Sequence, residues 1–199
     1  MNNRVLKMKD LMTIALLTVV YMIIYMVSMT AISALGQFGH AISPGICGLL
    51  AGAVLLFMNR KVGKMWEYTI FTALIMGIFT LMGAGYLPWV ITSMVMAILA
   101  DLIASRSNST PVWQLAIASG LMHVGQAWGS ILPASLFLES YRDEFINRGM
   151  MTAEAMEENI RYVTGLFGFL ATVITFVLAF AGMYLGYVIL RKHLATMKR

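Results

Sequence analysis

Three side chains that can hydrogen-bond lie close together in an otherwise apolar stretch: His123, Gln126 and Trp128. They fall within the stretch 111–137, which contains no charged residue. In a helix, His123 is roughly 18 Å from Pro111, near the middle of a bilayer core of about 30 Å. His123 and Gln126 are three residues apart and share a helix face. We expect them either to bind a small molecule in one cavity or to hydrogen-bond to a neighbouring helix.

Six more candidate substrate-binding residues flank the apolar segments. They are Gln37, His40, Tyr86, Trp89, Tyr141 and Arg142. Amide, imidazole, phenol, indole and guanidinium groups can together hold a small organic molecule. Tyr and Trp also gather at membrane interfaces whatever the function, so a role as membrane anchors is the alternative for the aromatic members.

One short motif is similar to a catalytic motif. Glu157-Glu-Asn-Ile-Arg161 approaches the Glu-Glu-x-x-x-Arg of CAAX-type intramembrane proteases but is one residue shorter. It lies in a polar segment, where the carboxylates have no buried site to activate a metal or water. The chain has no zinc-ligand cluster and no serine nucleophile motif. We therefore expect that the protein is not an enzyme and holds no resident cofactor or metal.

Four long runs without Asp, Glu, Lys or Arg must position the candidate residues. They lie between Asp10 and Arg60, Glu67 and Asp101, Arg106 and Glu139, and Arg161 and Arg191. Of the 199 residues, 60% are apolar and 12% charged, whereas soluble domains have about 25% charged residues. Because a membrane-spanning helix needs about 20 apolar residues, the runs predict a multi-pass helical membrane protein.

Two of these runs contain a break. The stretch 36–45 (GQFGHAISPG) predicts a turn in the first run, and 83–88 (GAGYLP) predicts one in the second. The result is an all-α membrane protein, a bundle of six transmembrane helices in a single domain over 1–199. The expected spans are 11–35, 44–58, 67–82, 87–105, 111–137 and 164–190.

The N-terminus has a competing interpretation, because Arg4, Lys7 and Lys9 precede an apolar stretch as in a cleavable signal peptide. That stretch is much longer than the usual hydrophobic region of about 7–15 residues, and no small-x-small cleavage site stands out after it. We therefore expect a retained first helix.

The loop charges predict the orientation in the membrane. With six spans, the two termini and the 59–66 and 106–110 loops share one side and carry 11 of the 14 lysines and arginines. The positive-inside rule then predicts that both termini are cytoplasmic, in a multi-pass protein of the cell membrane. The basic residues flank membrane spans without a nucleic-acid-binding motif, so we expect contact with the lipid bilayer and not with nucleic acid.

The only extensive polar segment on the opposite side is 138–163. Gly149 is expected to split it into two short helical pieces, and Thr152 is expected to cap the second. This extracellular helical segment, ahead of the last span, could cover an outward-facing pocket.

Glycines recur four residues apart inside the spans, at Gly48/Gly52, Gly125/Gly129 and Gly182/Gly186. Such pairs allow helix backbones to approach closely in lipid. We expect packing within the chain, with contact to a partner protein as the alternative.

Several segments together resemble the Trep_Strep family. They are 5–11 (VLKMKDL), 97–104 (AILADLIA), 141–143 (YRD) with 148–150 (RGM), and 186–193 (GYVILRKH). The likeness extends over nearly the whole chain and rests on the order and spacing of these segments. Members of this family are regarded as S components, the substrate-binding subunits of energy-coupling-factor (ECF) type ABC transporters.

The resemblance implies a subunit that captures a small organic micronutrient outside the cell, either a vitamin-like compound or a tetrapyrrole such as haem. It also implies three partner subunits: a transmembrane coupling subunit and two ATP-binding subunits. The chain has no Walker A sequence, so the ATPase must come from these partners. Haem would be cargo, with His40, His123, tyrosines and methionines as available iron ligands.

The chain departs from the family pattern at two places. Many S components use Ala-x-x-x-Ala in the first helix to contact the coupling subunit, and here Ala15 and Val19 occupy these positions. Relatives often have Gly-His before a tryptophan in the second outer loop, where this chain has Gly85-Tyr86 before Trp89. If that histidine binds substrate in relatives, Tyr86 replaces it here.

A self-sufficient secondary transporter or channel is the alternative function. Such proteins usually have inverted repeats and charged residues in mid-membrane. Neither is visible in this sequence.

Overall fold

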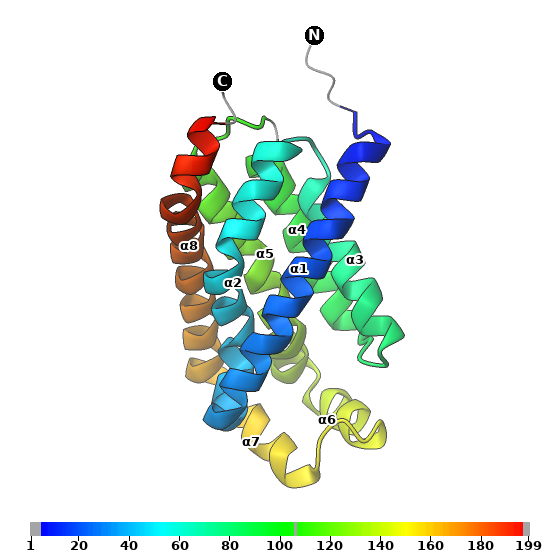
Figure 1. The fold of residues 1–199 in the computed structure, drawn as a ribbon. Helices are drawn as coiled ribbons and strands as arrows, with labels where there is room; N and C mark the ends of the chain where they lie inside the picture. Colours follow the sequence, from blue (N-terminus) through cyan, green and yellow to red (C-terminus); the bar gives the residue numbers. More distant parts are fainter. Residues whose placement is uncertain (1–4, 106, 197–199) are drawn as a thin grey trace.

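The computed structural model describes residues 5–105 and 107–196, and this part of the chain is helical, without strands. The helices are α1 (Met8–Ile32), a 3-10 turn η1 (Ser33–Leu35), α2 (Gly36–Lys61), α3 (Glu67–Leu81), α4 (Leu87–Ala104), α5 (Val112–Leu136), α6 (Leu138–Asn147), α7 (Ala153–Val163) and α8 (Gly165–Thr196). In Figure 1 the long helices stand side by side as a bundle, with both termini at one end and α6 and α7 at the other.

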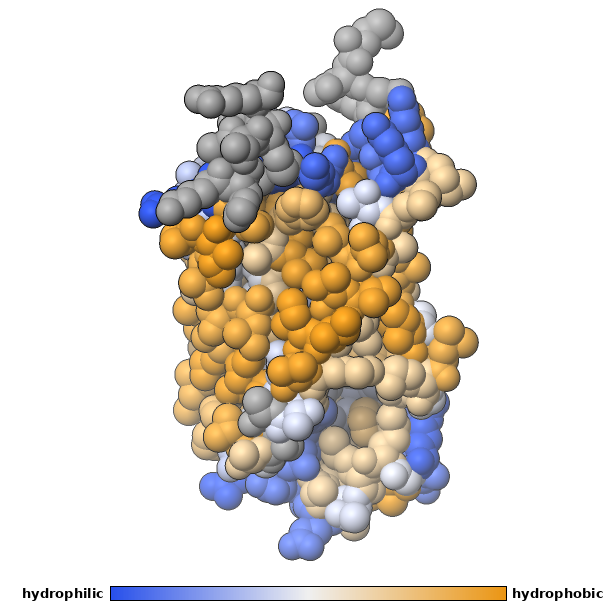
Figure 2. Space-filling view, viewed as in Figure 1, coloured by the Kyte–Doolittle hydropathy of each residue, from blue (hydrophilic) through white to orange (hydrophobic). Residues whose placement is uncertain are grey.

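The outer surface of the bundle suits a membrane. Four helices, α1, α2, α4 and α8, are long and apolar enough to cross a bilayer, and α3 is a shorter apolar helix. On the face seen in Figure 2, an apolar band crosses the middle of the molecule, with hydrophilic groups at both ends. A helix satisfies its own backbone hydrogen bonds, as a lipid-exposed segment must. The chain is therefore a multi-pass membrane protein.

The central helix α5 has 25 residues but is not one of those four helices. It packs against α2, α4 and α8, and 15 of its 25 residues are buried. A helix enclosed by others meets little lipid, so small and polar residues are tolerated along it. This is why α5 is the helix that carries His123 and Gln126.

Helix boundaries in the middle of the chain agree with the prediction. Helices α3, α4 and α5 begin and end within one residue of the expected spans. The predicted turn over 36–45 is wrong, because α2 already begins at Gly36, which has a positive φ of 58°. Pro44 lies inside α2 and cannot donate to the carbonyl of His40. The Ser43 hydroxyl donates to that carbonyl at 2.8 Å, which keeps the helix intact.

The glycine pairs of α2 and α8 form one tight interface. A Cβ atom added to Gly52 would lie 2.0 Å from the Gly182 carbonyl oxygen, and one added to Gly182 would lie 2.3 Å from that of Gly48. On α5, Gly125 and Gly129 face α4 in the same way. The expectation of packing within the chain is confirmed for these glycines.

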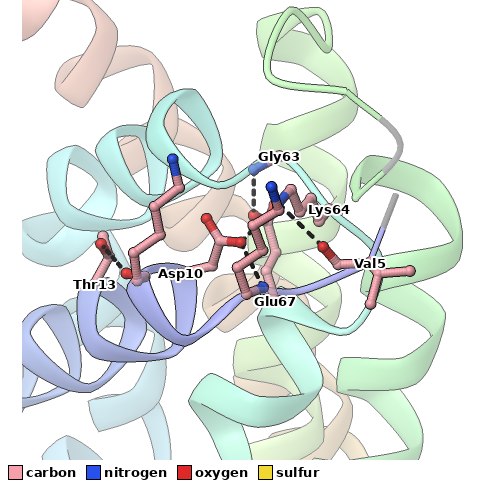
Figure 3. Close-up of polar contacts among 8 residues, drawn as sticks. Val5, Asp10, Thr13, Gly63, Lys64 and Glu67 are labelled. Atoms are coloured by element: carbon pink, nitrogen blue, oxygen red, sulfur yellow. Dashed lines mark hydrogen bonds and ion pairs between the residues drawn. The ribbon is translucent and has the colours of Figure 1, made fainter. Parts of the chain in front are cut away.

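At the end of the bundle that holds the termini, polar contacts join α1 to the loop between α2 and α3 (Figure 3). The Lys64 ammonium pairs with Asp10 at 2.6 Å and donates to the carbonyl of Val5 at 3.2 Å. The buried Glu67 accepts from the backbone N–H of Gly63 at 2.9 Å and from the Asn59 amide at 2.7 Å. These bonds fix the start of α3.

Asp101 of α4 caps the N-terminus of α3. Its carboxylate accepts from the backbone N–H groups of Tyr68 at 3.0 Å and Thr69 at 2.8 Å, and from the Thr69 hydroxyl. The first N–H groups of a helix have no partner within the helix, and an acidic cap also interacts favourably with the helix dipole. Asp101 is therefore a structural residue that ties α4 to α3.

The segment between α5 and α8 has the predicted form. Gly149, with a φ of 65°, separates α6 from α7. The Thr152 hydroxyl accepts from the backbone N–H of Ala155 at 3.2 Å, as an N-cap does. The two short helices lie across the end of the bundle away from the termini (Figure 1).

Candidate binding cavity

A cavity of about 190 Å³ lies near α6, between α2, α4 and α5. Five of the nine residues predicted from the sequence line it: His40, Tyr86, Trp89, Gln126 and Tyr141. They come from four separate parts of the chain, which the fold brings together. Residues that the sequence did not single out complete the lining, among them Tyr25, Phe79, Phe145 and Met150.

One wall of the cavity is a row of rings from α1, α3 and α4. The ring centroids of Tyr25 and Phe79 are 5.0 Å apart, and those of Phe79 and Trp89 are 4.9 Å apart. The Trp89 ring lies directly on Gly129, where an added Cβ atom would be 2.0 Å from Cδ1 of the indole. Gly129 therefore sets how far Trp89 stands back from the cavity.

A second group of rings comes from α6 and the loop before α4. The Tyr86 and Phe145 centroids are 5.3 Å apart, and those of Tyr141 and Phe145 are 4.8 Å apart. Burial raises the pKa of Tyr141, and burial followed by the charge of Glu144 raises that of Tyr86. Both phenols are therefore neutral at physiological pH.

A directional chain of hydrogen bonds leads from the cavity into the core. His123 Nδ1 lies 2.7 Å from the Ser119 carbonyl, which can only accept, so Nδ1 carries the proton. Nε2 must then accept from the Tyr21 hydroxyl, 3.2 Å away. Tyr21 in turn accepts from the Gln126 amide nitrogen at 3.4 Å. This order leaves the carbonyl oxygen of Gln126 as an acceptor for the cavity.

His123 itself is fully buried, and it is not among the cavity-lining residues. The structure therefore separates the pair that the sequence placed on one helix face. Gln126 lines the cavity, while His123 fixes the Gln126 side chain through Tyr21. The alternative for His123 is an interhelical hydrogen bond to Ser, Thr or a backbone carbonyl; its interhelical partner is instead Tyr21 of α1, and the carbonyl that it contacts, Ser119, lies on α5 itself.

Three other predicted residues lie outside this cavity. The Trp128 indole donates to the Thr172 hydroxyl at 3.3 Å. Gln37 accepts from the Asn159 amide at 3.3 Å, and Arg142 pairs with Glu157 at 2.7 Å. Gln37 and Arg142 thus hold α7 against α2 and α6.

Arg148 attaches the α6 end to the loop before α4. Its guanidinium donates to the Gly85 carbonyl at 2.6 Å and pairs with Glu144 at 2.5 Å. Gly85 immediately precedes Tyr86, a cavity residue. No sequence pattern predicts this contact, because an exposed arginine in a polar segment is not distinctive.

A second hollow of about 380 Å³ lies between α7 and the start of α2. It is lined by Gln37, Met151 and Ala155 among others, and it shares His40 and Met150 with the first cavity. His40 therefore stands at the boundary between the two hollows.

Ala15 and Val19, the predicted contact with a coupling subunit, lie on α1 and are not among the residues that line the cavity. Both are exposed on the outside of the bundle. They occupy a surface that lipid or another helix can cover.

The comparisons with known proteins give one match. A family model described as "Hypothetical bacterial integral membrane protein (Trep_Strep)" matches residues 8–195. No curated protein matches the chain, and no solved structure matches it.

Proposed function

Because the chain belongs to the Trep_Strep family of bacterial integral membrane proteins, we propose that it is the substrate-binding S component of an ECF-type ABC importer. In this role it captures a small organic micronutrient outside the cell. A transmembrane coupling subunit and two ATP-binding subunits then power its delivery. The chain itself performs no enzymatic reaction.

The observation that carries the proposal is the position of the cavity. Its lining includes Tyr141 and Phe145 of α6, and Figure 1 shows α6 at the end of the bundle opposite the termini. The end with the termini also holds Arg60 and Lys64, which suit the cytoplasmic face. Arg4, Arg106, Lys198 and Arg199, counted with the basic residues above, lie outside the described residues. A cavity on the opposite side suits capture from outside.

The proposed topology has six transmembrane helices, α1 to α5 and α8, with both termini in the cytoplasm. Helix α3 has 15 residues and is about 22 Å long, shorter than the roughly 30 Å core. The cap supplied by Asp101 and the polar contacts of Glu67 place its start at the basic end. Helices α6 and α7 then lie outside, beside the cavity.

Co-purification tests the partner requirement. The tagged chain is expressed with the ECF coupling subunit and both ATP-binding subunits of the same bacterium. We expect all four chains to elute together. Small molecules bound to the tagged chain are identified by mass spectrometry, with an absorption scan for the Soret band of haem.

Uptake of the identified molecule tests the energy source. We expect accumulation in cells only when the whole module is present, and its loss when the Walker A lysine of the ATP-binding subunits is replaced by alanine. Uptake by this chain alone, in a host without any ECF module, would instead identify a self-sufficient transporter.

A further inference from the structure

The cavity has no fixed charge in its lining. Among the described residues that line it, none is Asp, Glu, Lys or Arg. A charged ligand would lose its hydration there without gaining an opposite charge, which is costly in a buried site. The phenols of Tyr86 and Tyr141 are neutral as well. The lining therefore favours an uncharged ligand.

Aromatic side chains line two sides of the cavity. Tyr25, Phe79 and Trp89 form one side, and Tyr86 and Phe145 belong to the other. Aromatic rings gain about 0.5–1.5 kcal/mol per pair beyond simple burial when they stack in an offset or edge-to-face arrangement. A ligand with a flat ring makes the best use of this lining.

The polar groups on α5 and α2 are mainly acceptors. Gln126 presents its carbonyl oxygen, because its amide nitrogen is bonded to Tyr21. The hydroxyl protons of Ser43 and Ser130 are bonded to backbone carbonyls, which leaves their oxygens as acceptors. Pro133 cannot donate to the carbonyl of Gly129, a cavity residue. A ligand that lies against α5 must therefore supply hydrogen-bond donors.

The size of the cavity limits the ligand further. Pockets for drug-sized molecules measure about 300–1,000 Å³, and this cavity measures about 190 Å³. A tetrapyrrole such as haem, with four rings in one plane, is too large for the cavity. Its two carboxylates also conflict with the uncharged lining. One ring or two fused rings suit the space.

We infer that the cavity binds an uncharged compound of one or two flat rings, with an N–H or O–H donor directed at the Gln126 carbonyl oxygen. That this compound is the transported cargo rests on the proposed function. The binding preference itself belongs to the isolated chain and is measured without partners.

A matched panel of probes tests each part of the inference on the purified full chain in detergent. Benzamide and 2-naphthamide are uncharged rings with an N–H donor. Benzoate, 2-naphthoate and benzamidine add a charge, N,N-dimethylbenzamide removes the donor, and cyclohexanecarboxamide removes the flat ring. Haemin represents the tetrapyrroles. Dissociation constants are measured by calorimetry and by quenching of tryptophan fluorescence.

We expect the better of the two amides to bind at least about tenfold more tightly than any probe that lacks one of the three features. Gln126→Leu should weaken this amide about tenfold, whereas Gln114→Leu, the same change at the other end of α5, should leave it unchanged. Trp89→Leu provides a second variant that removes a ring face, with Trp113→Phe as its control. Thermal unfolding of every variant shows that it is folded.

Several results would overturn the inference: equal or tighter binding of the carboxylates, the amidine or haemin, or no binding of either amide at millimolar concentration. Unchanged amide affinity in both Gln126→Leu and Trp89→Leu would also overturn it. Selective amide binding by a chain that never associates with an ECF module would contradict the proposed function and leave the ligand class standing. If the chain associates with an ECF module and transports a ligand of another class, the inferred ligand class is wrong and the proposed function stands.

Discussion

At the scale of single residues, Tyr21 connects the cavity to the core. Its hydroxyl accepts from Gln126 and donates to His123, and all three side chains are buried. Tyr21→Phe removes this hydroxyl and leaves the imidazole Nε2 without a donor. A buried polar group that loses its partner costs about 1–3 kcal/mol.

We therefore expect Tyr21→Phe to lower the free energy of unfolding in detergent by that amount and to weaken 2-naphthamide binding. Tyr184→Phe on the exposed side of α8 is the control. Unchanged stability together with unchanged binding would show that the Gln126 side chain does not depend on Tyr21.

Gly129 controls the same cavity by steric means. A Cβ atom at this position would lie 2.0 Å from Cδ1 of Trp89 and 2.8 Å from its Cβ, so the whole indole must move. We expect Gly129→Ala to push Trp89 into the cavity and to weaken 2-naphthamide about tenfold, equivalent to ~1.4 kcal/mol. Tryptophan fluorescence, which reports the environment of the indole, should shift at the same time. If Gly129→Ala binds 2-naphthamide as tightly as the unmodified chain does, Gly129 does not control the position of Trp89.

The sequence identified part of the cavity, for reasons that differ from residue to residue. Gln126 stood out because polar side chains are scarce in an uncharged helix, and Tyr86 because it precedes Trp89 near a break. Phe79 and Phe145 could not be found this way, because an apolar ring has the same sequence pattern whether it faces lipid, core or ligand. The role of each predicted residue in binding stays a prediction.

At the scale of helices, the contact between α2 and α8 leaves no room for side chains at its centre. A Cβ atom at Gly52 would lie 2.0 Å from a backbone oxygen of α8, which cannot move aside as a flexible side chain can. Overpacking of this kind costs about 1–3 kcal/mol. We expect Gly52→Ala to lower the free energy of unfolding by about 2 kcal/mol.

Gly77 on α3 is the matched control, because a Cβ atom there would meet nothing within 4 Å. Alanine is favoured over glycine in a helix by roughly 0.5–1 kcal/mol, so Gly77→Ala should stabilise the protein slightly. Thermal and denaturant unfolding in the same detergent compare the two variants. Equal effects of the two changes would contradict the close packing of α2 and α8.

Arg148 holds α6 to the loop that carries Tyr86. Arg148→Gln removes the ion pair with Glu144 and weakens the bond to the Gly85 carbonyl. Exposed ion pairs contribute about 0.2–1 kcal/mol, so we expect roughly threefold faster release of 2-naphthamide. Arg161→Gln, an exposed arginine on α7, is the control. Release rates come from stopped-flow fluorescence, and equal rates would mean that α6 does not retain the ligand.

Helix positions followed from the sequence where charges and a Gly/Pro break bound the apolar segments, as for α3 and α4. The start of α2 did not, because Gly36, Gly39, Pro44 and Gly45 have low helix propensity. Tertiary structure overcomes this preference: α8 approaches closely at Gly45, and Ser43 satisfies the carbonyl that Pro44 leaves free. Neither contact can be inferred from local sequence.

At the scale of the whole molecule, the two ends of the bundle are expected on opposite sides of the membrane. Asn147 at the end of α6 and Val5 ahead of α1 are both exposed, and Cys47, the one cysteine of the sequence, is buried. Single cysteines at 147 and at 5 can therefore be labelled against a low background.

We expect a membrane-impermeant maleimide to label the Asn147→Cys chain in intact cells and the Val5→Cys chain only after permeabilisation, since the basic residues favour a cytoplasmic N-terminus. The unmodified chain gives the background from Cys47. Labelling of position 5 in intact cells would reverse the proposed orientation and place the cavity on the cytoplasmic side.

The glycine contact between α2 and α8 also has a mechanical consequence. Two backbones that meet without intervening side chains can neither slide nor rotate past each other without a clash, so we expect α2 and α8 to move as one rigid unit. Helix α3 lies at the opposite edge of the bundle, packed against α1 and α4. Any widening of the cavity for entry or exit is therefore expected on the side of Phe79 and Trp89, which α3 and α4 carry.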